Sequence, residues 1–344
     1  MKSNQTIAGW LALAALSTLN LQTSTGFAQG SLTPPGAPAP MMKTLAQVEP
    51  RTPISLLPFT ISVPGSYYVT TNLAGASGSQ GIAISAGNVT LDLNGFSLLG
   101  VSGSLDGIHV NGTFTNITVR NGVIVGWGFR GVNAYTAGNP RNLMFERLTI
   151  SANGSYGIQT EAGSEVRDCY CMSNVLDGIY SVGGLISGCV ARENGGCGIN
   201  ANYCSVRDCQ VWNNGNMGIY TGYSTVSGCY VGNNGQSGIY AIAGGCQIVG
   251  NNCYHNNTSG NTSSAGIFLY SANNRIEDNH VTASGYAGIQ VVTSSYVTNN
   301  IIIRNTVIGN GANNYIIPAN QVTGPLINTT GTITSANPWA NFSF

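Results

Sequence analysis

The sequence contains very little charge. Of its 344 residues, 12 are Lys or Arg and 12 are Asp or Glu, whereas charged residues make up about a quarter of an average globular protein. No lysine follows Lys43, and the formal net charge at pH 7 is zero. Because a nucleic-acid-binding protein carries a basic patch or stripe, the composition argues against nucleic acid as a partner.

Long apolar runs are also missing. The N-terminal apolar stretch, residues 7–21, is interrupted by Ser17, Thr18 and Asn20, and a membrane-spanning helix needs about 20 apolar residues. Its place between Lys2 and the small-x-small site made by Gly26 and Ala28 is typical of a secretory signal peptide. We therefore predict a signal peptide over residues 1–28, a secreted or periplasmic protein, and no membrane insertion.

Histidine is rare. The three histidines, His109, His255 and His280, are far apart in the sequence, and no calcium-binding motif is present. We therefore predict no metal site and no cofactor, with calcium left open as an alternative that no motif supports. Residues 29–50 contain several prolines, which remove backbone donors and fix φ, so this range is predicted to be a linker with an N-terminal cap.

A repeat with a period of 20 residues fills the middle of the chain. Short apolar alternations within each repeat are separated by Asn-Gly and Gly-Gly turns, which favours strands over helices. A fixed period of this size is typical of a solenoid, and we predict an all-β parallel β-helix. The recurring positions are Cys169, Cys189, Cys209 and Cys229; Asn174, Asn194, Asn214 and Asn234; and Gly178, Gly198, Gly218 and Gly238.

The same pattern extends beyond the regular block. Ten Gly-Ile or Gly-Val pairs run from Gly81 to Gly288 at intervals of 20 to 28 residues, and solenoids accept insertions in loops while keeping their strands. We predict about ten coils over residues 51–318. The spacing is lost near the C-terminus, where residues 319–344 are predicted to form a cap.

Two segments carry a resemblance to a known superfamily. Residues 88–96 (NVTLDLNGF) and 116–122 (NITVRNG) resemble the early coils of right-handed parallel β-helix proteins of the pectate-lyase-like superfamily. That superfamily includes NosD-type periplasmic proteins and polysaccharide lyases and epimerases. The resemblance implies a right-handed fold over roughly residues 59–318, but one architecture hosts many functions. The catalytic signature of polygalacturonases is absent.

The period turns sequence positions into rows of side chains. Residues one coil apart lie about 4.8 Å from each other. The cysteine row is predicted to point inward as small buried hydrophobes, with Asn251, Asn279 and Asn305 taking over its position further along the chain. The asparagine row is predicted to be structural, since asparagine tolerates left-handed backbone and its amide bonds locally.

The residue after each Gly-Ile pair is predicted to point outward. Aromatic rings and amides in such a row suit a sugar chain, because rings pack on pyranose faces and amides bond hydroxyls. The alternative is that tyrosine simply fits a half-buried β surface. The candidate substrate-binding residues are Tyr180, Asn200, Tyr220, Tyr240 and Phe268, within a row that also includes His109, Asn133, Gln159 and Gln290.

Charged pairs give candidates for catalysis. Arg167-Asp168 recurs two coils later as Arg207-Asp208, and a lyase needs a base together with a cation that holds a uronate carboxylate. The alternative is a set of solvated surface ion pairs. Asp106 and Arg130 occupy equivalent places before their glycines in adjacent coils, and the same two interpretations apply to them.

These observations predict an exported β-helix that presents an extended face to a polymer, with polysaccharide binding or modification as its function. Two alternatives stay open. One is a structural or adhesive surface protein without a catalytic site, and the other is a polysaccharide lyase or epimerase.

Overall fold

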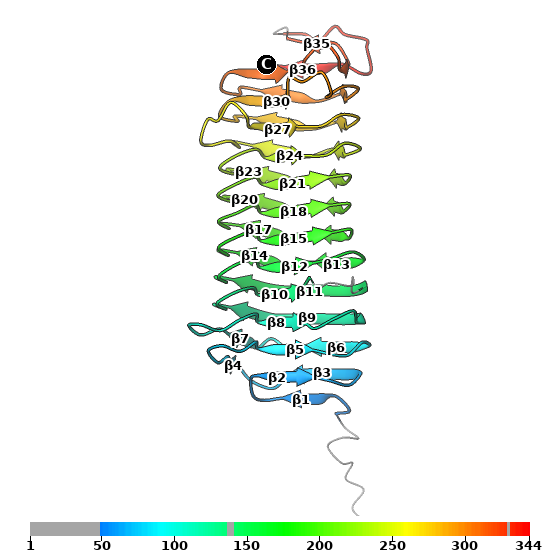
Figure 1. Ribbon diagram of the computed structural model, residues 1–344. Helices are drawn as coiled ribbons and strands as arrows, with labels where there is room; N and C mark the ends of the chain where they lie inside the picture. Colours follow the sequence, from blue (N-terminus) through cyan, green and yellow to red (C-terminus); the bar gives the residue numbers. More distant parts are fainter. Residues whose placement is uncertain (1–48, 136–140, 329–330) are drawn as a thin grey trace, which may run out of the picture. The chain divides into compact units, whose positions relative to one another are not determined.

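A computed structural model describes residues 49–135, 141–328 and 331–344. The predicted signal peptide, 1–28, and nearly all of the predicted linker lie outside these residues. The described residues form 36 strands and no helix, so no helix among them is long and apolar enough to cross a membrane. They build a right-handed parallel β-solenoid (Figure 1), as predicted.

Each coil contributes one strand to a 12-stranded sheet, called sheet B, and up to two strands to a second sheet, called sheet A. All strand pairs in sheet B are parallel and join consecutive coils. The strands of sheet B are β2 (Phe59–Ile61), β5 (Ile82–Ile84), β8 (Ile108–Val110), β10 (Val132–Ala134), β12 (Ile158–Thr160), β15 (Ile179–Val182), β18 (Ile199–Asn202), β21 (Ile219–Gly222), β24 (Ile239–Ala241), β27 (Ala265–Leu269), β30 (Ala287–Val291) and β33 (Asn313–Ile316).

Sheet A has two columns, which the long strands β9 and β11 bridge. The first column contains β1 (Thr52–Ile54), β3 (Gly65–Val69), β6 (Val89–Asp92), the first parts of β9 (Thr115–Val125) and β11 (Arg141–Ser151), β13 (Ser164–Arg167), β16 (Leu185–Ser187), β19 (Ser205–Arg207), β22 (Thr225–Ser227), β25 (Gln247–Val249), β28 (Arg275–Glu277), β31 (Ile301–Ile303) and β34 (Val322–Thr323). The second contains β4 (Leu73–Ala74), β7 (Ser97–Leu99), the last parts of β9 and β11, β14 (Tyr170–Met172), β17 (Val190–Arg192), β20 (Gln210–Trp212), β23 (Tyr230–Gly232), β26 (Asn252–Tyr254), β29 (His280–Thr282), β32 (Thr306–Ile308) and β36 (Asn341–Ser343), with β35 (Leu326–Ile327) paired to β36.

Ten of the twelve sheet B strands correspond to the ten glycine anchors of the sequence. The other two, β2 and β33, are the first and last strands of the sheet, and neither follows a Gly-Ile or Gly-Val pair. The C-terminal residues continue sheet A only, since β34 pairs with β31 and β36 pairs with β32.

The predicted inward cysteine row is confirmed. Cys169, Cys189, Cys209 and Cys229 are buried, and the Cys209 thiol donates to the carbonyl oxygen of Arg207 at 3.2 Å. A hydrogen bond with the preceding cysteine is the largest cause that raises the pKa of each of the last three thiols, and burial raises it further. All nine cysteines are free and buried, and they behave as core residues.

Asparagine amides form continuous ladders inside the corners. In the row predicted from the sequence, each Nδ2 donates to the Oδ1 one coil further on, at 3.0 Å from Asn174 to Asn194 and 2.9 Å from Asn214 to Asn234. Asn251 and Asn279 continue the cysteine row in the same way, as predicted. Each buried amide is thus satisfied by its copy.

The glycine before each sheet B strand is required by this ladder. A Cβ at Gly198 would lie 2.6 Å from Nδ2 of Asn214, and one at Gly218 would lie 2.6 Å from Nδ2 of Asn234. The glycine repeat therefore exists because the asparagine ladder leaves no space for a Cβ atom at these positions.

Candidate functional site

The outward residues of sheet B form a row in strict register. Cα pairing joins Gln159 to Tyr180, Tyr180 to Asn200, and Asn200 to Tyr220. The same pairing continues to Tyr240 and Phe268. The strand period thus places every sequence-predicted substrate-binding residue on one face of one sheet.

The C-terminal part of this row is a stack of rings. The ring centroids of Tyr220 and Tyr240 are 5.6 Å apart at an interplanar angle of 5°, and those of Tyr240 and Phe268 are 5.2 Å apart at 10°. Phe268 is only 3% exposed, so its ring supports the stack and is closed to a ligand. Tyr240 lies between two rings, which leaves Tyr220 with a ring face toward the smaller Asn200.

A second group of rings surrounds Tyr180. Its centroid lies 5.7 Å from that of Tyr135 and 5.6 Å from that of Tyr156. Tyr135 follows β10 and Tyr156 precedes β12, so both come from the turns that border sheet B. These two turn residues were not among the sequence candidates.

Asp106 organises a polar cluster where the chain enters β8. Its carboxylate lies 2.8 Å from Nδ1 of His109 and accepts hydrogen bonds from Nδ2 of Asn133 at 2.9 Å and from the backbone N–H of Arg130 at 3.1 Å. Burial alone would raise the pKa of Asp106, but these hydrogen bonds and the nearby Arg130 guanidinium lower it below its ordinary value. The side chain is therefore held as a buried carboxylate.

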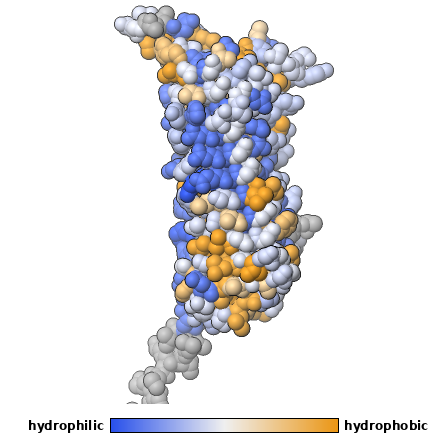
Figure 2. Space-filling view, turned by 90° about the vertical axis from the view of Figure 1, so that its left-hand side faces the viewer, coloured by the Kyte–Doolittle hydropathy of each residue, from blue (hydrophilic) through white to orange (hydrophobic). Residues whose placement is uncertain are grey.

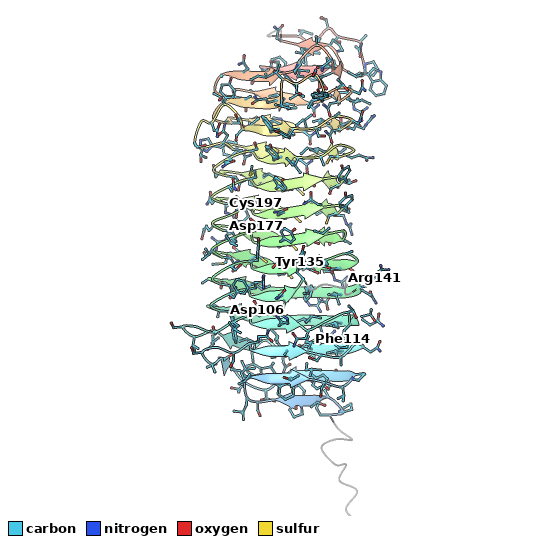
Figure 3. All side chains as sticks on the ribbon, viewed as in Figure 1. Asp106, Phe114, Tyr135, Arg141, Asp177 and Cys197 are labelled. Atoms are coloured by element: carbon cyan, nitrogen blue, oxygen red, sulfur yellow. The ribbon has the colours of Figure 1, made fainter. Side chains whose placement is uncertain are left out.

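Asp177 repeats this arrangement further along the chain. It accepts the backbone N–H of Cys197 at 2.7 Å and Nδ2 of Asn200 at 3.1 Å, which correspond to Arg130 and Asn133 around Asp106. Here burial raises the pKa of the carboxyl group, and no cation opposes the shift. Figure 3 shows Asp106, Asp177 and Cys197 along the same side of the solenoid.

The coils that follow Asp106 and precede Asp177 contain buried polar atoms without a hydrogen-bond partner. They are Nε of Arg130, Oε1 of Gln159 and Oε2 of Glu161. Gln159 is 7% exposed and Glu161 is 8% exposed. Because a buried unpaired polar group costs about 1–3 kcal/mol, such a group in a native protein calls for an explanation, and a ligand is one.

We call this region the β8–β18 patch, after the sheet B strands that border it. Its members are Asp106, His109, Arg130, Asn133, Tyr135, Tyr156, Gln159, Glu161, Asp177, Tyr180 and Asn200. Burial raises the pKa values of Tyr156, Tyr180 and Glu161, and nearby negative charge from Asp177 adds to the shift for both tyrosines. A pocket of about 240 Å³ opens beside it, lined by Tyr135, Glu161, Ala162 and Val182.

Exposed apolar side chains border the same coils. Leu105, Phe129, Val175 and Leu176 lie in the turns that lead into β8, β10 and β15, and all four are exposed. Figure 2 shows apolar surface concentrated in the N-terminal half of this side, whereas hydrophilic surface covers the coils above it. Polar clusters and apolar surface thus coincide in one part of the solenoid.

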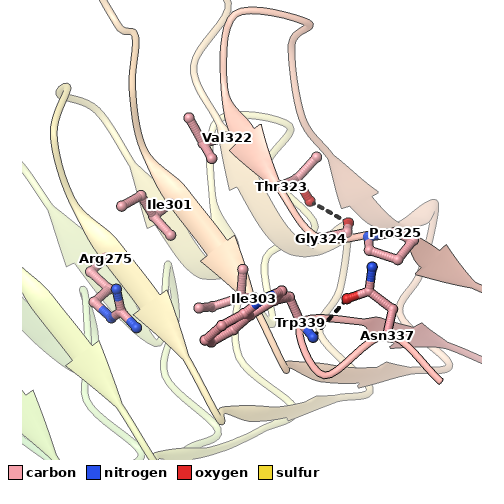
Figure 4. A pocket seen from close by; sticks show the side chains of 9 residues that line it. All are labelled: Arg275, Ile301, Ile303, Val322, Thr323, Gly324, Pro325, Asn337 and Trp339. Carbon is pink, nitrogen blue, oxygen red and sulfur yellow. Dashed lines mark hydrogen bonds between the residues drawn. The ribbon is translucent and has the colours of Figure 1, made fainter. Parts of the chain in front are cut away.

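A second pocket, of about 370 Å³, lies near the C-terminus (Figure 4). It is mainly apolar, with Ile301, Ile303, Val322 and Trp339 in its wall. Its Arg275 is paired with Glu277. No buried unpartnered side-chain atom among the described residues belongs to this lining, so the β8–β18 patch is the stronger candidate site.

The four residues predicted as catalytic candidates lie elsewhere. Arg167 and Arg207 end strands of sheet A, and Nη2 of Arg167 is 2.6 Å from Oε2 of Glu146. Asp168 and Asp208 occupy the corner between the two columns of sheet A, with φ of +52° and +56°. The side chain of Asp208 is 68% exposed, and its oxygen lies 3.9 Å from Nη1 of Arg207.

These corners explain why the Arg-Asp pair recurs. A left-handed backbone conformation disfavours most side chains but is tolerated by Asp, Asn and Gly, and Gly188 and Gly228 occupy the same corner in the intervening coils. The structure therefore does not bring the four charged candidates together with the row on sheet B.

The sequence pattern identified Asp106 and Arg130 as candidates, but Asp177 was not predicted. Both aspartates stand directly before a Gly-Ile pair, in Asp-Gly-Ile-His (106–109) and Asp-Gly-Ile-Tyr (177–180). The signal for Tyr135, Tyr156 and Glu161 was weaker, because the direction of a side chain in or beside a turn does not follow from strand alternation.

Comparison with known proteins gives two matching families. The profile of the family described as "Periplasmic copper-binding protein (NosD)" matches residues 162–343, which is more than half of the chain. The profile described as "Right handed beta helix region" matches residues 67–225. No curated protein matches the chain.

Solved structures share the fold at low sequence identity. The A-module of the Azotobacter vinelandii mannuronan C-5 epimerase AlgE6 is 19% identical with a TM-score of 0.53, over 81% of this chain and 90% of that one. The A-module of AlgE4 from the same organism is 17% identical with a TM-score of 0.51, over 76% of this chain and 91% of that one. At this identity the likeness shows the fold alone.

Proposed function

The chain belongs to the NosD family of periplasmic copper-binding proteins, and we propose that this member holds an extended polysaccharide along the outward face of sheet B. The observation that carries the proposal is the register of Tyr180, Asn200 and Tyr220, which sets rings and an amide at one-coil steps. A location outside the cytoplasm agrees with the family and with the predicted signal peptide, and it would expose the protein to such polymers.

The face has the chemistry that a sugar chain needs. Tyr220 presents a ring face beside Asn200, and rings of this kind pack against the apolar faces of pyranoses. Asn200 lies within the same row, and amides can both donate to and accept from hydroxyl groups. The two solved epimerases named above act on a polysaccharide according to their descriptions, which is compatible with this use of the fold.

The described residues do not fit a copper site. Copper prefers thiolates, thioethers and imidazoles, but no group of three or more His, Cys, Asp or Glu side chains that could hold a metal occurs among them. The cysteines are buried in the core, and His109 is bonded to Asp106. We therefore derive no role for copper in this chain.

Binding is tested with purified protein and a glycan array, followed by calorimetry on each glycan that binds. Truncation of Tyr220 to Ala is expected to weaken binding about fivefold or more, because aromatic side chains in interfaces commonly contribute over about 1 kcal/mol. The triple variant with Tyr180, Tyr220 and Tyr240 changed to Ala is expected to abolish it. Tyr296→Ala, at an isolated exposed tyrosine, is the matched control.

Two outcomes would overturn the proposal. If the triple variant binds glycans as the parent does, or if the parent binds none, the row is a structural feature of the sheet. A structural or adhesive surface protein would then be the better description.

A second candidate function, polysaccharide lyase or epimerase, is favoured by the Asp106 cluster. His109 is oriented by the carboxylate of Asp106, with Nδ1 at 2.8 Å, and an oriented imidazole is a suitable general acid or base. Arg130 supplies a cation in the adjacent coil, with Nη1 3.7 Å from Asp106. Arg167, Asp168, Arg207 and Asp208, the candidates from the sequence, lie on sheet A and at its corner, and we propose structural roles for them.

The catalytic candidate has its own readout. A lyase releases an unsaturated product that absorbs ultraviolet light, and an epimerase incorporates deuterium from heavy water into the polymer. Either signal should disappear in His109→Gln while glycan binding is kept. If the parent gives neither signal with any glycan that it binds, the protein is a binding module only.

A further inference from the structure

Two buried oxygen acceptors, one on β12 and one directly after it, lack hydrogen-bond partners. Oε1 of Gln159 and Oε2 of Glu161 have no hydrogen bond, and both residues are more than nine-tenths buried. Gln159 lies on β12 in register with Tyr180, and Glu161 is the first residue after that strand. Glu161 also lines the 240 Å³ pocket beside Tyr135. The two unpartnered atoms beside this pocket are therefore acceptors.

The charge of the β8–β18 patch is negative. Asp106, Glu161 and Asp177 contribute three carboxylates, and Arg130 contributes one positive charge, which gives −2 with His109 counted as neutral. The cation is already used, because Arg130 lies 3.7 Å from Asp106 and its guanidinium sits 4.1 Å from the ring centroid of Phe129. Glu161 has no ion pair among the described residues, and neither has Asp177.

Aromatic rings occupy the space next to the unpaired carboxylates. Tyr135 and Tyr156 both pack against Tyr180, in the coils that carry Glu161 and Asp177. The quadrupole of an aromatic ring attracts cations at its face, and groups of such rings recognise ammonium ions. The negative charge of Asp177 acts on Tyr156 and Tyr180, so the rings and the carboxylate form one electrostatic unit.

We propose that the β8–β18 patch binds a primary ammonium group carried by an amino-sugar unit of the polysaccharide. This inference rests on the proposed function and names the class of substrate. The ammonium group has three N–H donors and no acceptor, which matches the unpartnered acceptors of Gln159 and Glu161. A uronate carboxylate would instead add a fourth negative charge beside Glu161.

The experiment compares a β-1,4-linked glucosamine hexamer with the N-acetylglucosamine hexamer, by calorimetry at a pH at which the amines are protonated. The two ligands share length and linkage and differ in charge. The parent is expected to bind the glucosamine hexamer about tenfold more tightly, since a cation–π contact is worth about 0.5–1 kcal/mol when exposed and about 2 kcal/mol or more when desolvated, and 1.4 kcal/mol is tenfold. Added salt should reduce this preference.

Isosteric variants locate the effect. Glu161→Gln and Asp177→Asn, which remove one charge each, are both expected to reduce the preference at least threefold. Glu165→Gln is the matched control, because it also removes one carboxylate, but on β13 of sheet A, where Glu165 forms an ion pair with Arg167. It should leave the preference unaltered. Thermal unfolding confirms that each variant is folded, and the two variants are independent tests of the same site.

The outcomes separate this inference from the function on which it rests. If the parent binds both hexamers equally, or prefers the acetylated one, the ammonium site is refuted while polysaccharide binding stands. If the preference exists but survives in both Glu161→Gln and Asp177→Asn, the site is also refuted. If the parent binds neither hexamer and no other glycan, both proposals fall.

Discussion

At the scale of single residues, the corners of the solenoid decide which polar side chains are structural. The chain turns through left-handed residues such as Asp168, Asp208 and Asn213, and the side chain that follows each of them points into the interior. Asn214 is one of these inward residues, and its amide joins three coils through Asn194 and Asn234. Polar character alone therefore does not identify a binding residue in this fold.

The ladder gives the first prediction at this scale. Asn214→Ala should lower the free energy of unfolding by about 3 kcal/mol, because Asn194 loses an acceptor for its backbone N–H and its Nδ2 inside the core. Asn213→Gly, at the preceding corner with φ of +56°, should change it by less than about 0.5 kcal/mol. Chemical denaturation of the two variants measures both values, and equal losses would contradict the ladder's role.

Asp106 gives a second prediction, on pH. Although burial opposes the shift, hydrogen bonds from His109 and Asn133 lower its folded pKa below the ordinary value of 3.8. A lowered folded pKa contributes stability that is present above the unfolded pKa and is lost as the pH falls. The difference in unfolding free energy between the parent and Asp106→Asn should therefore be largest near neutral pH and shrink below about pH 4. A difference independent of pH would refute this.

At the scale of strands, the sequence period was sufficient for the fold and for the row. Gly-Ile or Gly-Val pairs mark the start of ten sheet B strands, and alternation then places Tyr180, Asn200 and Tyr220 outward in register. It could not predict that Phe268 is buried, because burial of an outward ring depends on what packs over it. Nor could it place Tyr135 and Tyr156, since they lie in turns between strands, where alternation ends.

The cysteine row gives the prediction at this scale. Cys209→Ala should lower the free energy of unfolding by about 1–3 kcal/mol, because it leaves a cavity between Cys189 and Cys229 that the stacked coils fill only in part. A thiol reagent should label the native parent slowly and the unfolded protein quickly, since the four thiols of the row are buried. Rapid labelling of the native protein at these positions would contradict their inward orientation.

At the scale of the whole solenoid, the most regular coils and the coils that form most of the β8–β18 patch are different parts of the chain. The 20-residue period is strict from Gly178 to Gly238, whereas Asp106 to Gly157 lies in coils of 21 to 26 residues. The longer coils provide the turn residues that build the β8–β18 patch. The regular coils repeat the same amide and thiol contacts.

This regularity predicts that a whole coil is removable. Deletion of residues 199–218 joins Gly198 to Ile219 and keeps every ladder in register, so a cooperative thermal transition is expected. Deletion of residues 199–217 leaves one residue too many, which reverses the inward and outward sides of the next strand, and should give unfolded protein. Circular dichroism on heating distinguishes the two, and equal behaviour would show that the register is not essential.

The side-chain-to-side-chain hydrogen bonds of the buried ladders all donate toward the C-terminal end, from Asn174 to Asn194 and from Asn214 to Asn234. Asp106 and Asp177 each accept a hydrogen bond from the coil that follows, so their two clusters have the same orientation and are related by a translation of about 14 Å, or three coils, along the axis. A sugar chain has a reducing and a non-reducing end, and its sugar units also repeat in one direction along the chain. A polymer held along sheet B as proposed would therefore meet a face with a defined direction, and its two orientations would bind with different affinities.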